Sequence, residues 1–325
     1  MRLGAALAAL ALLTLAACGS SEGDSGSGPW TFTDDLGSKI TLDAAPERLL
    51  VQSSMAAALT DLGVGDKVVG TFGPLKDAEG KPDSQVAGLD IDHVTDVTAA
   101  GEYGSIDLEK AATLKPDLVV TSAYLDDDLW YVNDATAKDL KKLAPIAVVS
   151  FDGKTLIELL EGTERAAKAL GADLDDDDVT EAHVEFDAAA KRVKDASAEL
   201  GDRTILAGSP SKELFYVSNP AVSPDLSYWR DELGLPLVVP SNPDAGGYFE
   251  SLSWEKADKY PADVFLYDDR VGAAGLGLLE DQPVFETLAA AKSKAYIPWT
   301  SVAPPSFQAY ADLMNRLADD LAKFS

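Results

Sequence analysis

The sequence of 325 residues contains one cysteine and two histidines. With one thiol, no disulfide can form within the chain. Two histidines are too few for a zinc or manganese site built from several imidazoles, so we expect no metal site in the protein itself. His93 lies in a polar stretch beside Asp92, and His183 lies in a predicted helix, where a packed or solvent-facing role is common. Because a nucleophile elbow and a phosphate-binding loop are also missing, the sequence disfavours an enzyme and indicates no cofactor.

Positive charge is scarce as well: 27 Lys and Arg stand against 55 Asp and Glu, for a formal net charge of −28. Such acidity disfavours nucleic acid and anionic lipid surfaces as partners. Two acidic runs, at residues 126–128 and 175–178, lack the alternating spacing and central glycine of a calcium loop. We therefore expect both runs on solvated loops or helix starts.

Long apolar runs are missing except at the start of the chain. Residues 3–17 carry no charge, consist mostly of Leu and Ala, and follow Arg2. This run is too short to span a bilayer and has the pattern of a secretory signal peptide. It ends in Leu15-Ala16-Ala17-Cys18, which resembles the lipobox of a bacterial lipoprotein. The resemblance implies removal of residues 1–17, acyl chains on Cys18, and attachment to the extracytoplasmic face of the cell membrane through lipid alone. A cysteine placed there by chance is the alternative.

The rest of the chain alternates short apolar runs with stretches of helical periodicity, which is typical of an α/β fold. We expect strands at residues 49–51, 68–69, 118–120, 146–149, 204–207, 237–239, 264–267 and 296–297. We expect helices at about 55–62, 108–114, 135–143, 228–233, 283–291 and 306–324. In the last helix, apolar residues recur every three or four positions, so it should pack as the closing helix.

Residues 153–200 have no strand pattern but two helical stripes, separated by Gly171 and the second acidic run. This indicates an N-terminal α/β lobe at 34–152 and a C-terminal α/β lobe at 201–325, joined by stiff connector helices that restrict hinge motion. Residues 18–33 precede the first lobe. Because residues 19–28 are rich in Ser and Gly, we expect the 18–33 segment to be a flexible tether.

An internal sequence repeat supports two related halves. Residues 107–111 (DLEKA) lead to 116–120 (PDLVV), and residues 253–257 (SWEKA) lead to 261–265 (PADVF). Glu109 precedes Asp117 by eight residues, as Glu255 precedes Asp263. In both copies a short helix should run through a proline-bounded turn into a buried strand. Chance similarity of two helix-to-strand units is the alternative.

Several segments, in order, resemble the class III periplasmic binding proteins, the substrate-binding lipoproteins of iron-siderophore and cobalamin ABC importers. They are residues 46–51, 62–70, 107–119, 252–255, 263–264, 283–292 and 296–299. The resemblance implies two Rossmann-like lobes, a long rigid connector helix and a ligand cleft between the lobes. It also implies that Glu109 and Glu255, one on each lobe, dock on arginines of the permease. Equivalent acids on two lobes could engage a symmetric basic partner, although plain solvated residues would look the same.

Cleft residues follow from the resemblance by position. Siderophore binders often place an arginine after the position of Gly101, where this chain has Glu102 and Tyr103, which argues against strong recognition of an anion. Aromatic rings at strand ends suit the flat, partly apolar flank of an iron chelate or macrocycle, and an arginine could add a charge. The candidate ligand-binding residues are Tyr103, Tyr124, Arg230, Tyr248, Phe249, Arg270 and Trp299, each of which could instead serve packing alone.

These observations predict a monomeric, lipid-anchored solute-binding protein that captures a ferric siderophore and delivers it to an ABC importer. Cobalamin or haem in the same fold is an alternative, although haem would need a tyrosine as its axial ligand. A sensing or adhesion lipoprotein without a transport role is another.

Overall fold

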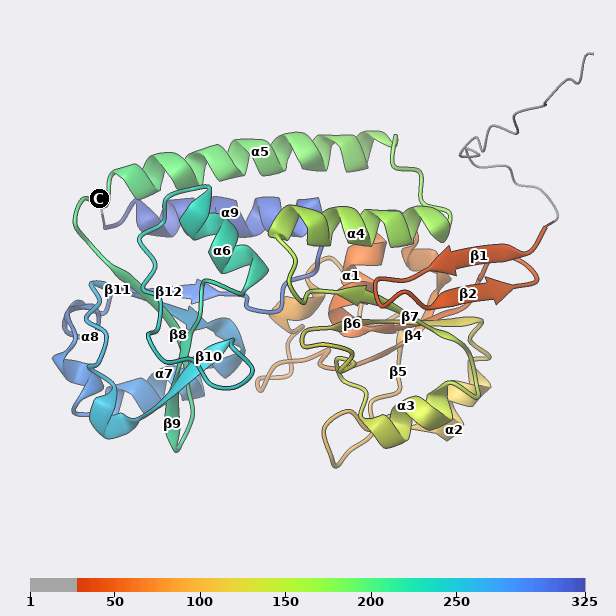
Figure 1. Ribbon diagram of the computed structural model, residues 1–325, viewed down its shortest axis with the longest axis horizontal. Helices are drawn as coiled ribbons and strands as arrows, with labels where there is room; N and C mark the ends of the chain where they lie inside the picture. Colours follow the sequence, from red (N-terminus) through yellow and green to blue (C-terminus); the bar gives the residue numbers. More distant parts are fainter. Residues whose placement is uncertain (1–27, 325) are drawn as a thin grey trace, which may run out of the picture.

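The computed structural model describes residues 28–324, which form two lobes side by side with helices α4 (Leu156–Ala169), α5 (Asp177–Ala198) and α9 (Phe307–Leu321) along one side (Figure 1). Each lobe is built on a five-stranded sheet. The predicted fold class, two α/β lobes with a helical connector, is confirmed. Within residues 28–324, none of the helices is long and apolar enough to cross a bilayer. The predicted signal peptide and Cys18 lie outside these residues.

The N-terminal lobe has a fully parallel sheet in the order β5-β4-β3-β6-β7. Its strands are β3 (Leu49–Gln52), β4 (Val68–Phe72), β5 (Thr95–Asp96), β6 (Leu118–Ala123) and β7 (Ile146–Ser150). Its helices are α1 (Ser53–Asp61), η1 (Gly65–Lys67), η2 (Ser84–Val86), α2 (Leu108–Thr113) and α3 (Asp134–Leu140). Every residue of β3, β6 and β7 is buried, as expected for parallel strands covered on both faces.

An antiparallel hairpin of β1 (Trp30–Thr33) and β2 (Lys39–Leu42) precedes this sheet. Phe32 and Ile40 pack into the N-terminal core, and the Trp30 indole nitrogen donates a hydrogen bond to the Ala169 carbonyl at 2.6 Å. The predicted tether at 18–33 is therefore too long by four residues, because residues 30–33 form a strand.

The C-terminal lobe has a mixed sheet in the order β10-β9-β8-β11-β12, in which β8, β11 and β12 are parallel to one another, and β9 is antiparallel to both of its neighbours, β8 and β10. Its strands are β8 (Ile205–Pro210), β9 (Leu214–Ser218), β10 (Phe249–Ser253), β11 (Val264–Asp268) and β12 (Tyr296–Trp299). Its helices, besides α9, are α6 (Pro224–Asp231), η3 (Trp254–Lys256), η4 (Asp269–Val271), α7 (Gly272–Glu280), η5 (Phe285–Thr287) and α8 (Ala289–Ser293). The strand predicted at 237–239 is wrong: Leu237 forms only an isolated bridge with Ile205.

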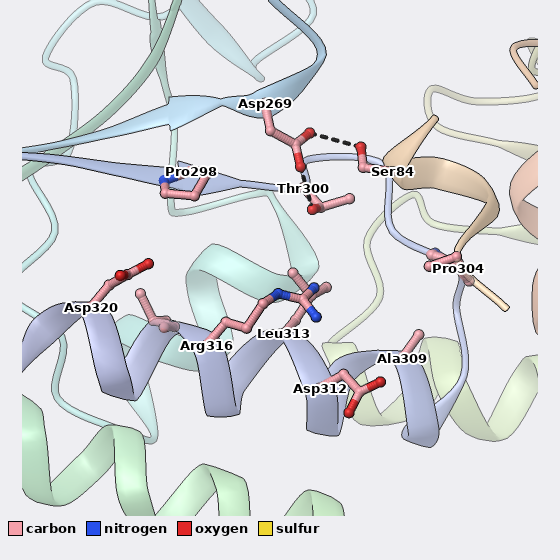
Figure 2. A pocket seen from close by; sticks show the side chains of 12 residues that line it. Ser84, Asp269, Pro298, Thr300, Pro304, Ala309, Asp312, Leu313, Arg316 and Asp320 are labelled. Carbon is pink, nitrogen blue, oxygen red and sulfur yellow. Dashed lines mark hydrogen bonds between the residues drawn. The ribbon is translucent and has the colours of Figure 1, made fainter. Parts of the chain in front are cut away.

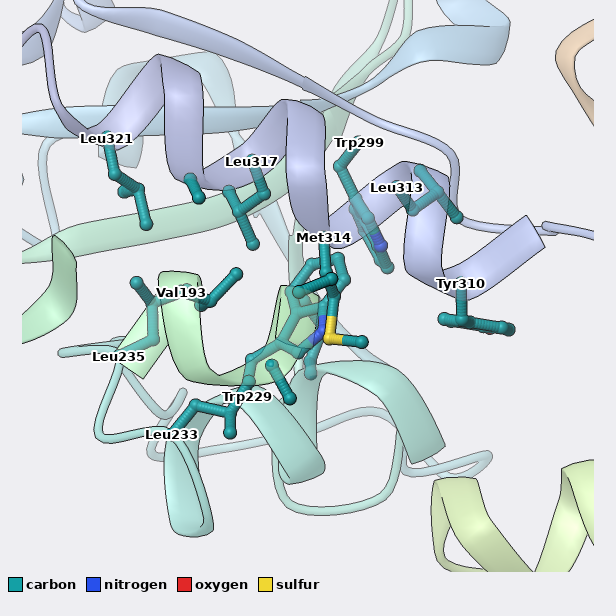
Figure 3. Packing of buried hydrophobic residues seen from close by; sticks show 14 of the residues in the cluster. Val193, Trp229, Leu233, Leu235, Trp299, Tyr310, Leu313, Met314, Leu317 and Leu321 are labelled. Carbon is teal, nitrogen blue, oxygen red and sulfur yellow. The ribbon is translucent and has the colours of Figure 1, made fainter. Parts of the chain in front are cut away.

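The connector helices contribute to both cores. In α4, Leu160 packs in the C-terminal core, whereas Leu159 packs in the N-terminal core. In α5, Val179 belongs to the N-terminal core and Val193 to the C-terminal core, where Figure 3 shows it near the apolar side chains of α9. Because the same two helices are packed into both lobes, rotation of one lobe against the other would disturb close-packed side chains.

The two repeated segments occupy equivalent positions in the two lobes. Asp117 precedes β6 and accepts hydrogen bonds from the backbone nitrogens of Glu47 and Arg48, both at 3.0 Å, just before the neighbouring strand β3. Asp263 precedes β11 and accepts one from the backbone nitrogen of Thr204 at 2.9 Å, just before the neighbouring strand β8. Each aspartate thus ties the start of its own strand to the start of the next strand in the sheet. The two halves share this unit in structure as well as in sequence.

Candidate ligand cleft between the lobes

A cavity of about 320 Å³ lies between the lobes. Its walls include residues that directly follow the carboxyl ends of β6 and β7 in one lobe, and in the other lobe the second residue after β11 and the last residue of β12. In open α/β sheets, ligands bind outside the carboxyl ends of the strands, so this is the expected place for a ligand. The lining comprises Tyr124, Leu125, Trp130, Phe151, Ser218, Ser223, Pro224, Asp225, Asp244, Gly246, Gly247, Tyr248, Phe249, Arg270, Trp299, Ser301, Val302 and Tyr310.

Aromatic rings form the wall from the N-terminal lobe. The Tyr124 ring stacks on Phe151 with centroids 4.2 Å apart and contacts Trp130 at 4.5 Å. Tyr124 follows β6 and Phe151 follows β7, two strands that pair in parallel, which explains why their rings meet. Burial raises the pKa of Tyr124 well above its ordinary value, so its hydroxyl stays protonated.

The wall from the C-terminal lobe combines rings with a buried carboxyl group. The indole nitrogen of Trp299 donates to Asp225 at 2.7 Å, and the Ser223 hydroxyl donates to the same carboxyl group at 2.7 Å. Asp225 stands in the first turn of α6, and burial raises its pKa, although these hydrogen bonds oppose the rise. Trp299 is therefore held in one orientation, which makes it a rigid part of the wall.

Among the described residues that line the cavity, Arg270 is the one with a basic side chain. It lies in η4 directly after β11, and its guanidinium group binds the Asp268 carboxylate through two atoms, with Nε–Oδ1 at 2.9 Å and Nη2–Oδ2 at 2.6 Å. Asp268 is almost fully buried, and such a two-point pair fixes the guanidinium plane. The Nε and Nη2 atoms of Arg270 thus already donate hydrogen bonds to Asp268.

Four polar atoms buried in the cavity wall have no hydrogen-bond partner among the described residues. They are the Tyr124 hydroxyl, the Trp130 indole nitrogen and the hydroxyls of Ser218 and Ser301. A buried polar group without a partner costs about 1–3 kcal/mol, so such groups are rare unless a ligand or water completes them. Their clustering in one cavity indicates a surface built to bind a polar molecule.

Two hydrogen bonds join the lobes beside the cavity. The Tyr248 hydroxyl donates to the Tyr124 carbonyl oxygen at 2.6 Å, and the Ser84 hydroxyl donates to Asp269 at 2.9 Å. Figure 2 shows Asp269 between Ser84 and Thr300, at the edge of a second cavity of about 300 Å³ along α9. None of the described residues that line this second cavity has an aromatic ring. The aromatic cavity is the better candidate for a bulky chelate.

The structure brings five of the seven predicted ligand residues to the aromatic cavity: Tyr124, Tyr248, Phe249, Arg270 and Trp299. Tyr103 lines an adjoining hollow that shares Tyr124, Leu125 and Trp130 with it. Arg230 lines neither; its guanidinium group binds Asp231 on α6 at 2.6 and 2.7 Å. The prediction that Arg230 faces the ligand is not supported by its position.

Sequence reasoning missed several lining residues. Phe151 follows a predicted strand just as Tyr124 does, so the strand-end rule would have found it. Tyr310 lies on the apolar face of the last helix and is buried there, and it also reaches the cavity. Trp130, Asp225 and Asp244 lie on loops or a helix start, where no periodic pattern marks them.

Glu109 on α2 and Glu255 in η3 are both exposed and lie on different lobes, outside the cavity lining. Their helical turns precede the two equivalent strands β6 and β11. The pair thus stands in matching positions on the two halves, and its predicted contact with a permease stays a prediction.

Comparison with known proteins identifies the family of the chain. The model of the periplasmic binding protein family matches residues 50–303. DesE, a ferric-siderophore receptor protein from Streptomyces coelicolor, is 37% identical with a TM-score of 0.81, over 90% of this chain and 98% of that one. The Fe(3+)-citrate-binding protein YfmC of Bacillus subtilis (strain 168) is 25% identical over 293 residues, 87% of this chain and 84% of the relative. FhuD2 from Staphylococcus aureus with bound ferrioxamine B shares the fold, with 18% identity and a TM-score of 0.58 over 85% of this chain and 98% of that one.

The resemblance seen in the sequence is confirmed by the family match, which covers most of the chain and both lobes. The chain therefore belongs to the periplasmic binding protein family, whose members are extracytoplasmic substrate-binding components of transporters rather than enzymes.

Proposed function

We propose that this protein captures a ferric siderophore in the aromatic cavity and delivers it to an ABC importer. The observation that carries the proposal is the cavity itself, in which a stacked aromatic wall stands beside four unpartnered polar atoms. Aromatic faces suit the apolar flank of a chelate, and the polar atoms suit the oxygens that surround its iron. DesE and YfmC, by their names, bind iron chelates.

The ligand contacts that we propose are Tyr124, Tyr248, Phe249, Arg270 and Trp299, with Tyr103 at the adjoining hollow. We also propose that the protein works as a monomer, held at the extracytoplasmic face of the membrane by acyl chains on Cys18. Glu109 and Glu255 are the proposed contacts to permease arginines. Their exposure on separate lobes supports this role, because a symmetric basic partner could engage both at once.

Tryptophan fluorescence tests the ligand class, because Trp130 and Trp299 both line the cavity. The purified protein is titrated with ferric siderophores, the same siderophores without iron, cobalamin and haem. We expect saturable quenching by at least one ferric siderophore and weaker quenching by its iron-free form. A Trp130→Phe variant with reduced quenching would place the signal in the cavity, and a Trp30→Phe variant serves as the control, because Trp30 packs in the hairpin of the N-terminal lobe. Saturable binding of cobalamin or haem with no response to any ferric siderophore would overturn the proposal.

A further inference from the structure

Charge around the aromatic cavity is strongly one-sided. Among the described residues that line this cavity and the adjoining hollow, Arg270 is the only basic side chain, and its guanidinium group is already paired with Asp268. Asp225 and Asp244 line the cavity itself. Glu102, Asp128 and Asp134 line the hollow beside it. A ligand that enters would therefore meet several carboxylates and a cation whose charge is largely neutralised.

The carboxylates differ in how they are held. Asp225 is buried and accepts hydrogen bonds from Trp299, Ser223 and the Leu226 backbone nitrogen, so it is part of the wall. Asp244 is exposed and accepts the Ser251 hydroxyl at 2.6 Å. Glu102 and Asp128 are exposed and have no ion-pair partner among the described residues. These exposed acids keep their full effect on an approaching charge, because no cation offsets them.

Apart from the remaining N–H groups of Arg270, whose charge is paired with Asp268, the polar groups left free to bind a ligand are uncharged. The Trp130 indole nitrogen can only donate a hydrogen bond, and the hydroxyls of Tyr124, Ser218 and Ser301 can donate as well. Such donors suit the oxygens of a neutral or weakly charged chelate. They provide no positive charge to compensate the desolvation of an anionic one.

From this charge distribution, and resting on the function proposed above, we propose that the cleft selects ferric chelates with no net negative charge. Hydroxamate groups neutralise ferric iron charge for charge, so a trishydroxamate complex is neutral, or cationic when its chain carries an amine. Catecholate and citrate complexes keep negative charge and would be repelled by the acidic residues of the aromatic cavity and the adjoining hollow. The ligand class is thus a neutral or cationic hydroxamate-type chelate.

The test uses one chelate in three charge states, so that shape stays nearly constant. Ferrioxamine B has an ammonium tail and is cationic, its N-acetyl derivative is neutral, and its N-succinyl derivative is anionic. Affinity is measured by tryptophan quenching at low salt. We expect the cationic and neutral forms to bind and the anionic form to bind at least about tenfold more weakly, a gap that shrinks as salt is added. Equal affinity for the three forms, or preference for the anionic form or for ferric citrate, would overturn the charge selection.

Substitution of the exposed acidic residues tests whether they cause the charge selection. Glu102→Gln, Asp128→Asn and Asp244→Asn, combined, should narrow the gap between neutral and anionic forms several-fold. The control combines Glu181→Gln, Asp187→Asn and Asp202→Asn, which remove the same number of charges at exposed positions outside the aromatic cavity and the adjoining hollow. An equal change in the control would show that total charge, and not the cleft, sets the preference, and would contradict the proposal. If no ferric chelate of any charge binds, the proposed function itself fails; if all three forms bind alike, only the charge selection fails.

Discussion

The hydroxyl of Tyr124 is a group whose role at the cavity can be separated from its role in packing. Its ring stacks on Phe151 and its pKa is raised by burial, yet its oxygen has no partner among the described residues. We expect Tyr124→Phe to keep the stacked ring and to weaken chelate binding by about 0.5–1.5 kcal/mol, the net contribution of one hydrogen bond.

Thermal unfolding without ligand provides the internal check on this variant. Because the substitution removes a buried polar atom without a partner, the unfolding temperature should stay the same or rise. Chelate titration of wild type and variant, with Tyr216→Phe on β9 as a control outside the cavity lining, measures the difference. Unchanged chelate affinity in Tyr124→Phe would mean that the ligand does not reach this hydroxyl.

Asp61 gives a pH-dependent prediction. It ends α1 in the N-terminal lobe and accepts the hydroxyl of Ser306, the N-cap of α9. Burial raises the pKa of Asp61 from 3.8 to about 6, with a further contribution from the charge of Asp312, while the Ser306 hydrogen bond opposes the rise. The folded protein therefore holds this proton more tightly than the unfolded chain does, so its free energy of unfolding falls as the pH rises from about 4 to about 6.

Asp61→Asn removes this titration while its amide oxygen can still accept the Ser306 hydroxyl. We expect the variant to be more stable than wild type above about pH 7, by up to about 3 kcal/mol, and to differ little near pH 4. Urea denaturation at both pH values measures the two differences. A gain of equal size at both would show that the charge of Asp61 is not its cause.

At the scale of elements, the repeated helix-to-strand unit predicts matched effects in the two lobes. Asp117 and Asp263 each bind backbone nitrogens just before the neighbouring parallel strand. We expect Asp117→Ala and Asp263→Ala to lower the free energy of unfolding by similar amounts, about 1–2 kcal/mol each. Exposed Asp66→Ala in η1 is the control, and denaturant unfolding is the measurement. A loss in one variant alone would contradict the structural equivalence of the two units.

The elements also show what the sequence could and could not reveal. The parallel strands β3, β6 and β7 are buried along their whole length, so unbroken apolar runs predicted them. The strands β9 and β10 lie toward one edge of the C-terminal sheet and alternate buried with less buried residues, and neither was predicted. Helix α7 was missed because it contains three glycines, which weaken any helical prediction.

The site follows the same logic. The sequence predicts Tyr124 and Trp299 because each lies at the carboxyl end of a strand, where ligands bind in an α/β sheet. The charge of Arg230 makes it a candidate, but nothing in the sequence tells which way a residue on the short helix α6 points, and in the structure it pairs with Asp231. The unpartnered atoms of Ser218 and Ser301 depend on contacts between distant segments and have no local pattern.

At the scale of the whole molecule, substitution of the two exposed glutamates should distinguish chelate binding from uptake through the importer. Because Glu109 and Glu255 lie outside the cavity lining, Glu109→Arg with Glu255→Arg should leave chelate affinity unchanged. If they contact permease arginines, the double variant should cost several kcal/mol of docking through lost pairing and like-charge repulsion, and uptake of iron chelate should stop. Glu181→Arg with Glu185→Arg on the exposed side of α5 is the matched control. Normal uptake by the double variant in a strain that lacks the native protein would refute the docking role.

The proposed lipid anchor also concerns the whole molecule. Cys18 is the one cysteine of the chain and thus the one sulfur of that kind for thioether lipidation. We expect Cys18→Ser to abolish labelling by a fatty-acid probe and to release folded protein that binds chelate with unchanged affinity. Cell fractionation and labelling provide the measurements. Membrane attachment that persists in this variant would contradict the lipoprotein interpretation.

The connector helices have a consequence for how the protein unfolds. Leu159 of α4 and Val179 of α5 complete the core of one lobe, while Leu160 and Val193 of the same helices complete the core of the other. Neither lobe therefore has a complete hydrophobic core without the connector, and loss of either core exposes side chains on the shared helices. The two lobes should melt as a single cooperative unit, so that a chelate held between them protects the entire fold, including the hairpin far from the cleft, against proteolysis.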